Sequence, residues 1–221
     1  MVSLRAMISH RVGSLILLML LGCAPANVSP GMTFLAGLNH YQVEMARLES
    51  RPDRWFDRQR LGESLKQTHL VTMGGSREFN RLIDLDVRRR EFVIALRDPS
   101  LRPDRAKEIR AELPAMQRNM DDLKGVIKRQ LSAAELRAHE QPQVIETVAA
   151  IGLLHLGLDG FSGSNSFAYP SVRAVKVGQY LVTDHGNVTT VRTPEGQTYR
   201  CALILVQDEG AGIRCEPPSG K

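Results

Sequence analysis

Apolar residues recur at steps of three and four through most of residues 32–160, which is the period of an amphipathic helix. The first stripe consists of Phe34, Leu38, Tyr41, Met45 and Leu48. Pro52 ends this helix, and Asp53 is placed to cap a second one. The apolar positions of the second helix are Trp55, Phe56, Leu61 and Leu65. Ser76 follows a Gly-Gly break and is the candidate cap of a third helix, from about residue 77 to residue 97.

A further stripe follows the short connector formed by residues 98–103. It consists of Ile109, Leu113, Met116, Met120, Leu123 and Ile127. A connector this short predicts an antiparallel helical hairpin, either as a short coiled coil or as part of a packed bundle. Pro114 either kinks the second helix or marks its true start. Ser132 and Glu135 have the spacing of a capping box, so we expect a separate helix to begin there.

Residues 144–158 are apolar on nearly every side of a helix. Such a helix is buried in the core, or it contacts a protein partner or lipid. The candidate partner surface on it comprises Val144, Val148, Ile151 and Leu158. His155 lies on an apolar face, which favours a hydrogen-bonded core histidine. The Gly- and Ser-rich residues that follow predict a linker over residues 161–170.

The last part of the chain changes to a strand pattern rich in β-branched residues. The expected strands are residues 172–177, 180–183, 188–192 and 199–206, with turns at 184–187 and 193–196. We therefore expect an α+β fold, with an N-terminal helical hairpin or bundle over residues 32–160. A small C-terminal antiparallel β unit follows over residues 171–221.

The final hairpin predicts a disulfide. A turn centred on Asp208 places Cys201 opposite Cys215, Leu203 opposite Ile213 and Val206 opposite Gly210. Directly opposed residues have Cβ atoms close enough for a disulfide after a slight pinch of the strands. The alternative is a metal site formed by Cys201, Cys215 and His185, which lacks a clear fourth ligand.

The N-terminus carries a targeting pattern. Arg5 and Arg11 precede a brief apolar run over residues 15–21, which is typical of a secretory signal and too short to span a bilayer. Its end, Leu-Leu-Gly-Cys at residues 20–23, resembles the lipobox of bacterial lipoproteins. The resemblance implies a signal peptide over residues 1–22 and lipidation of Cys23, which anchors the protein in a membrane.

In the lipoproteins that this chain resembles, a residue other than Asp after the cysteine favours export to the outer membrane. Here that residue is Ala24, so we expect an outer-membrane lipoprotein facing the periplasm of a bacterial cell envelope. Residues 23–31 are rich in Pro, Ser and Gly and are expected to form a tether.

Charge and composition exclude few classes of binding partner. Removal of Arg5 and Arg11 with the signal lowers the formal charge from +5 to +3, which indicates no particular partner. Aromatic residues make up 5% of the chain, so stacking platforms for nucleic acid are not expected. The run Arg88, Arg89 and Arg90 is expected to be a solvated helix face or a contact for anionic lipid or an acidic partner. The carboxylates of Asp84 and Asp86 are expected to be exposed to solvent on the same helix.

The sequence contains no nucleophile elbow, phosphate loop or dinucleotide fingerprint. We therefore expect no catalytic, cofactor-binding or metal-binding residues. The favoured function is a non-catalytic interaction protein, an accessory or scaffold subunit of a cell-envelope assembly with an envelope protein as its partner. Its oligomeric state is left open.

Two alternatives remain. Residues 131–136 resemble the helix starts of small periplasmic stress chaperones, whose motif is Leu-Thr-x-x-Gln, and the resemblance implies a chaperone-like lipoprotein. The other alternative is an envelope hydrolase that joins His155 or His185 to a distant carboxylate.

Overall fold

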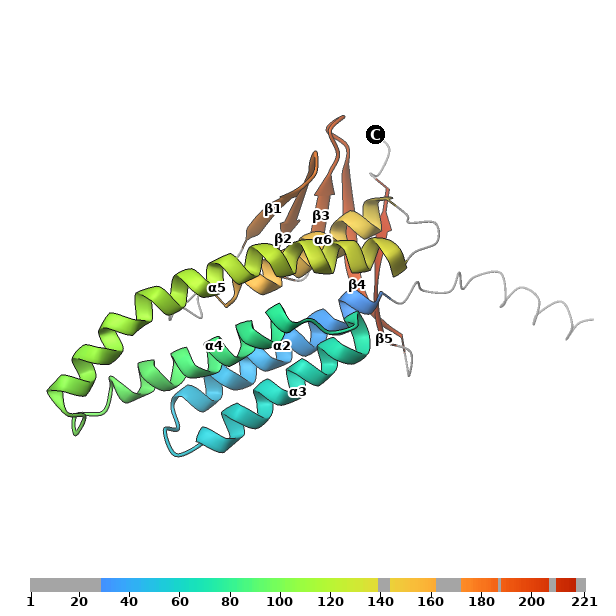
Figure 1. The fold of residues 1–221 in the computed structure, drawn as a ribbon. Helices are drawn as coiled ribbons and strands as arrows, with labels where there is room; N and C mark the ends of the chain where they lie inside the picture. Colours follow the sequence, from blue (N-terminus) through green and yellow to red (C-terminus); the bar gives the residue numbers. More distant parts are fainter. Residues whose placement is uncertain (1–28, 139–143, 162–171, 187, 207–209, 218–221) are drawn as a thin grey trace, which may run out of the picture.

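The computed structural model describes residues 29–138, 144–161, 172–186, 188–206 and 210–217. Together they form an α+β fold, as predicted. The helices are α2 (Pro30–Glu49), α3 (Trp55–Met73), α4 (Arg77–Ala95), α5 (Pro103–Ala138) and α6 (Val144–Asp159). The strands are β1 (Arg173–Val177), β2 (Tyr180–Asp184), β3 (Thr189–Arg192), β4 (Thr198–Val206) and β5 (Gly210–Glu216). Figure 1 shows the helices extending away from the sheet, with α6 beside it.

The predicted helical hairpin is confirmed. Helices α4 and α5 pack against each other across the short connector, where Asp98 Oδ1 accepts a bond from the Ser100 backbone N–H at 2.8 Å. Ser76 caps α4 as expected, because its side chain accepts a bond from the Phe79 N–H at 3.2 Å. The prediction for Asp53 is wrong. The residue before α3 is Arg54, which makes no side-chain capping bond.

The expected separate helix at Ser132 does not exist, because α5 runs without a break to Ala138. The Ser132 hydroxyl donates to the Lys128 carbonyl one turn back in the same helix. Glu135 instead satisfies the start of another helix: it accepts bonds from the Ser29 hydroxyl at 2.6 Å and the Gly31 N–H at 3.0 Å. Pro114 lies inside α5, and Figure 1 shows that this helix is bent.

Helix α2 begins at Pro30, two residues before the expected start. Ser29 is its N-cap and accepts a bond from the Met32 N–H, while the Ser29 N–H donates to the Ala211 carbonyl of β5 at 2.9 Å. The tether prediction is therefore wrong for residues 29–31, which are folded against the sheet. Residues 23–28, including Cys23, lie outside the described residues.

The five strands form an antiparallel meander in the order β1-β2-β3-β4-β5. The predicted register of the last hairpin is confirmed, since Cys201 pairs with Cys215, Leu203 with Ile213 and Val206 with Gly210. Cys201 and Cys215 form a disulfide, which closes a short loop and contributes about 3 kcal/mol in the chain-entropy account. The alternative of a metal site at these cysteines is therefore wrong.

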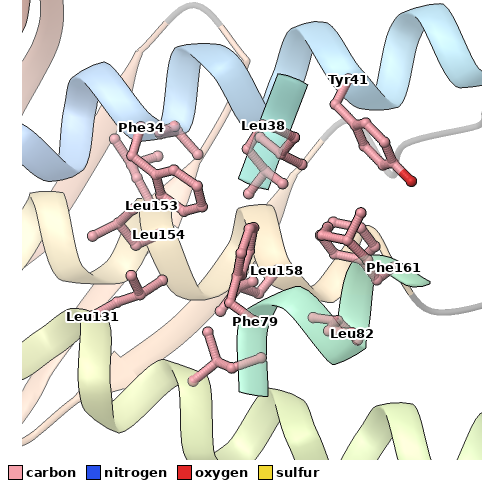
Figure 2. Packing of buried hydrophobic residues seen from close by; sticks show 14 of the residues in the cluster. Phe34, Leu38, Tyr41, Phe79, Leu82, Leu131, Leu153, Leu154, Leu158 and Phe161 are labelled. Atoms are coloured by element: carbon pink, nitrogen blue, oxygen red, sulfur yellow. The ribbon is translucent and has the colours of Figure 1, made fainter. Parts of the chain in front are cut away.

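One hydrophobic core joins the helices and the sheet. It contains Phe34 and Leu38 of α2, Phe79 of α4, Leu154 of α6 and Val182 of β2. Figure 2 shows the side chains of α2, α4, α5 and α6 meeting in one cluster. Helix α6 contacts both the other helices and the sheet, so it lies at the centre of the fold. Of the expected linker, only Phe161 is described, and its side chain is fully buried in this core.

Candidate functional site

The candidate partner surface on α6 is mostly interior. Val148, Ile151 and Leu158 are buried against the sheet and the other helices, and only Val144 is exposed. The core interpretation of this helix is therefore the correct one. A partner surface made of these three buried residues is wrong, because reaching them would require the fold to open.

The arginine run is also mostly interior. Arg88 is exposed and pairs with Glu112 at 2.5 Å, whereas Arg89 and Arg90 are almost fully buried. A solvated face at Arg89 and Arg90 is therefore wrong. Both side chains turn inward because Asp86, one turn earlier on α4, is itself fully buried and pairs with them.

Asp86 is the centre of a buried polar network between α2 and α4. Its Oδ2 accepts bonds from the Tyr41 hydroxyl at 2.9 Å and from Arg90 Nε at 2.8 Å, and Arg90 also pairs with Glu49. Burial, followed by the Asp86 carboxylate, raises the pKa of the Tyr41 hydroxyl well above its usual value. Burial acts to lower the pKa of Arg90, but Asp86 outweighs it and the pKa is raised. The network locks two helices together with every charge paired.

Ser132 and His155 come close enough to resemble a nucleophile with its base, at 2.9 Å from Oγ to Nε2. The hydroxyl proton is already engaged, because Ser132 Oγ donates to the Lys128 carbonyl at 2.7 Å. His155 Nε2 must therefore carry the proton and donate, so it cannot accept one from Ser132. Burial lowers the pKa of His155 below its usual value. The pair is a contact between α5 and α6.

A small pocket lies between α2, α6 and the sheet. Its volume is about 100 Å³, below the range of 300–1,000 Å³ that is usual for small-molecule sites. The charged groups at its wall, Arg173 and Asp184, pair with each other at 2.6 Å. Neither His155 nor His185 lines it, so it does not provide the joined histidine and carboxylate that a hydrolase would need.

The face of the sheet turned away from the core is strongly basic. Val182, Val191 and Cys201 point into the core, so the alternate residues point outward. The exposed charged residues on this outer face are Lys176, Arg192, Arg200, Arg214 and Glu216. Within the described residues, none of the four basic side chains makes an ion pair. We call this surface, with a formal charge of +3, the basic sheet face.

A second exposed feature is an aromatic pair at the start of α3. Trp55 and Phe56 are 45% and 77% exposed, and their rings meet edge to face at 4.5 Å. Figure 1 places the connection between α2 and α3 at the end of the bundle away from the sheet. We call this pair the aromatic tip. Trp and other aromatic residues are enriched where protein partners bind.

Sequence reasoning missed both surfaces, although signals for them existed. Trp55 and Phe56 are neighbours, so they cannot both point to the core from one helix face. The register that paired Cys201 with Cys215 also assigned Arg200 and Arg214 to the opposite face of the sheet.

No helix of the described residues is both long enough and apolar enough to cross a membrane. In the same part of the chain, no cluster of three or more His, Cys, Asp or Glu side chains could hold a metal ion. No protein-family model, no curated protein and no solved structure matches this chain.

Proposed function

We propose that this protein is a lipid-anchored interaction protein of the bacterial cell envelope, without catalytic activity, which serves as an accessory or scaffold subunit of an assembly. Acylated Cys23 would hold it to the outer membrane, facing the periplasm. The aromatic tip would bind an envelope protein partner. The single observation that carries the proposal is the exposure of Trp55 and Phe56 at the end of the bundle away from the anchored start.

The arrangement of the helices supports a spacer role. Helix α2 has 20 residues and is therefore about 30 Å long. Its start at Ser29 is only six residues from Cys23, and its other end leads to Trp55. A protein anchored at Cys23 would thus carry the aromatic tip away from its tether. The buried network around Asp86 would keep this spacer stiff, because it fixes α2 to α4.

Site-specific photo-crosslinking in the producing bacterium tests this proposal. A photoreactive amino acid at position 56 should give one dominant crosslinked envelope protein. The same group at position 118, which is exposed on α5, serves as the control and should not give that product. Trp55→Ser should weaken the crosslink at position 56 without changing the fold, since Trp55 contributes to no buried core.

Two outcomes would contradict the proposal. Equal crosslinking from positions 56 and 118 would show that the aromatic tip is not a specific surface. A broad range of unfolded proteins, in place of one partner, would favour the chaperone-like alternative.

A further inference from the structure

The basic sheet face concentrates positive charge on one side of the five-stranded sheet. Neighbouring strands lie about 4.8 Å apart, and Arg200 and Arg214 occupy adjacent strands at diagonal positions. Their charges lie within the Debye length of about 8 Å at physiological ionic strength, so their potentials add. Three threonines on the same face, Thr183, Thr190 and Thr198, add hydroxyl groups between the basic side chains.

The surface lacks what a nucleic-acid platform needs. No aromatic residue shares this face in the described strands, since Tyr180 and Tyr199 both point to the other side. Nor is the face apolar enough to resemble the core of a stable protein interface, where charged residues are depleted. Cations and hydroxyl groups on one exposed face instead complement the phosphate groups of a lipid surface.

The described part of the chain also begins beside this sheet. The Ser29 backbone N–H bonds to the Ala211 carbonyl of β5, and Ser29 is six positions after Cys23. Six residues span at most about 20 Å when extended. Cys23 therefore lies within about 20 Å of Ser29 and of the β5 edge of the sheet. The helices cover the other face and leave the basic one open.

We propose that the basic sheet face docks on anionic phosphate headgroups of the membrane that holds Cys23. Only the choice of that membrane rests on the proposed function, because the face and its charge are independent of the anchor. Each basic residue near an anionic bilayer surface strengthens binding about fivefold. The face would therefore give the anchored protein a fixed orientation, with the sheet against the lipid.

Vesicle binding of the unlipidated chain tests this proposal. The probe is the chain from residue 23 onward with Cys23→Ser, which keeps every described residue, mixed with vesicles of phosphatidylcholine alone or with phosphatidylglycerol. Binding should require phosphatidylglycerol and weaken as salt is added. Arg200→Ala combined with Arg214→Ala should lower the partition coefficient roughly 25-fold, from about fivefold for each charge.

Matched variants distinguish binding through this face from a general effect of the protein's positive charge. Lys176→Ala with Arg192→Ala removes two other charges of the same face and should cause a similar loss. Arg110→Ala with Arg118→Ala removes two exposed charges from α5 and should leave binding unchanged. Equal losses from the sheet and α5 variants would overturn the proposal.

Two further results would overturn the proposal: no binding to phosphatidylglycerol vesicles, or binding to polyglutamate in place of the vesicles. Polyglutamate binding would point to an acidic protein partner. Because the probe carries no lipid, its result does not depend on whether Cys23 is acylated or whether the aromatic tip binds a protein.

Discussion

At the scale of single residues, Asp86 shows how two neighbouring carboxylates can have different roles. Asp84 is exposed and pairs with Lys66, whereas Asp86 is fully buried and holds Tyr41 and Arg90. We predict that Asp86→Asn lowers the free energy of unfolding by about 3–5 kcal/mol, because it leaves buried arginine charge without its partner. Urea unfolding followed by circular dichroism measures the change.

Asp84→Asn is the matched control and should cost less than about 1 kcal/mol, as expected for an exposed ion pair. Tyr41→Phe should fall between the two, at about 1–2 kcal/mol, because it removes one hydrogen bond to Asp86. Similar losses for the Asp84 and Asp86 variants would contradict the assignment of Asp86 as the centre of the network.

His69 gives the stability a predicted dependence on pH. Its ring packs against the rings of Phe34 and Phe79, and burial lowers its pKa from 6.5 to about 4. Below pH 6.5, His69 binds a proton in the unfolded chain but stays unprotonated in the folded protein until the pH approaches 4. The contribution is therefore complete above pH 6.5 and is lost as the pH falls to about 4, by up to about 3 kcal/mol.

The comparison of the wild-type chain with His69→Phe isolates this effect, because phenylalanine keeps a ring in the same place and does not titrate. Urea unfolding between pH 4 and pH 7 should show a smaller loss of stability in the variant. An identical pH dependence in the two proteins would remove His69 as the cause.

The residue scale also shows what sequence can and cannot predict. The pairing of Cys201 with Cys215 follows from strand geometry alone, so it was predictable. The burial of Arg89 and Arg90 was not, because a run of like charges usually faces solvent. Only the inward position of Asp86, which depends on α2 packing against α4, reverses that expectation. Glu135 was misassigned for a similar reason, since its partners Ser29 and Gly31 lie on a distant helix.

At the scale of elements, the approach of α6 to the sheet depends on a glycine. A Cβ atom at Gly152 would lie 2.6 Å from the Val182 side chain, which is closer than van der Waals contact allows. We predict that Gly152→Ala lowers the free energy of unfolding by about 1–3 kcal/mol, because α6 must move away from β2. Thermal unfolding measures the difference.

Gly125→Ala on α5 is the control for helix propensity. A Cβ atom there meets nothing nearer than the end of Arg129, at 3.9 Å. This substitution should stabilise the protein by about 0.5–1 kcal/mol, because alanine is the better helix former. If Gly152→Ala also stabilised the protein, close packing of α6 on the sheet would not be what this glycine provides.

The elements themselves were largely predictable from periodicity. Helices α2, α4 and α5 follow the predicted apolar stripes, and β1 to β4 lie within two residues of the predicted strands. The stripe predicted for α3 is wrong in part, because Leu65 is buried but Trp55 and Phe56 are exposed. The placement of α6 was left between core, partner and lipid, because a helix that is apolar on nearly all sides looks the same in each environment. The sheet covers one side of α6, and this contact shows that the helix belongs to the core.

At the scale of the whole molecule, the described helices and strands share one core, and the aromatic tip and the basic sheet face lie outside it. The aromatic tip lies at one end of the bundle, and the basic sheet face lies beside the start of the described chain. We propose that the sheet face docks on a membrane and that the aromatic tip binds a protein partner.

The proposed lipid anchor is tested most directly by mass spectrometry of the N-terminal peptide of the protein purified from the cells that produce it. The account predicts a peptide that begins at Cys23 and carries the mass of attached acyl chains, and it predicts that Cys23→Ala releases the protein from the membrane fraction. A mature N-terminus at another residue, or an unmodified Cys23 in a protein that is recovered without membranes, would contradict it.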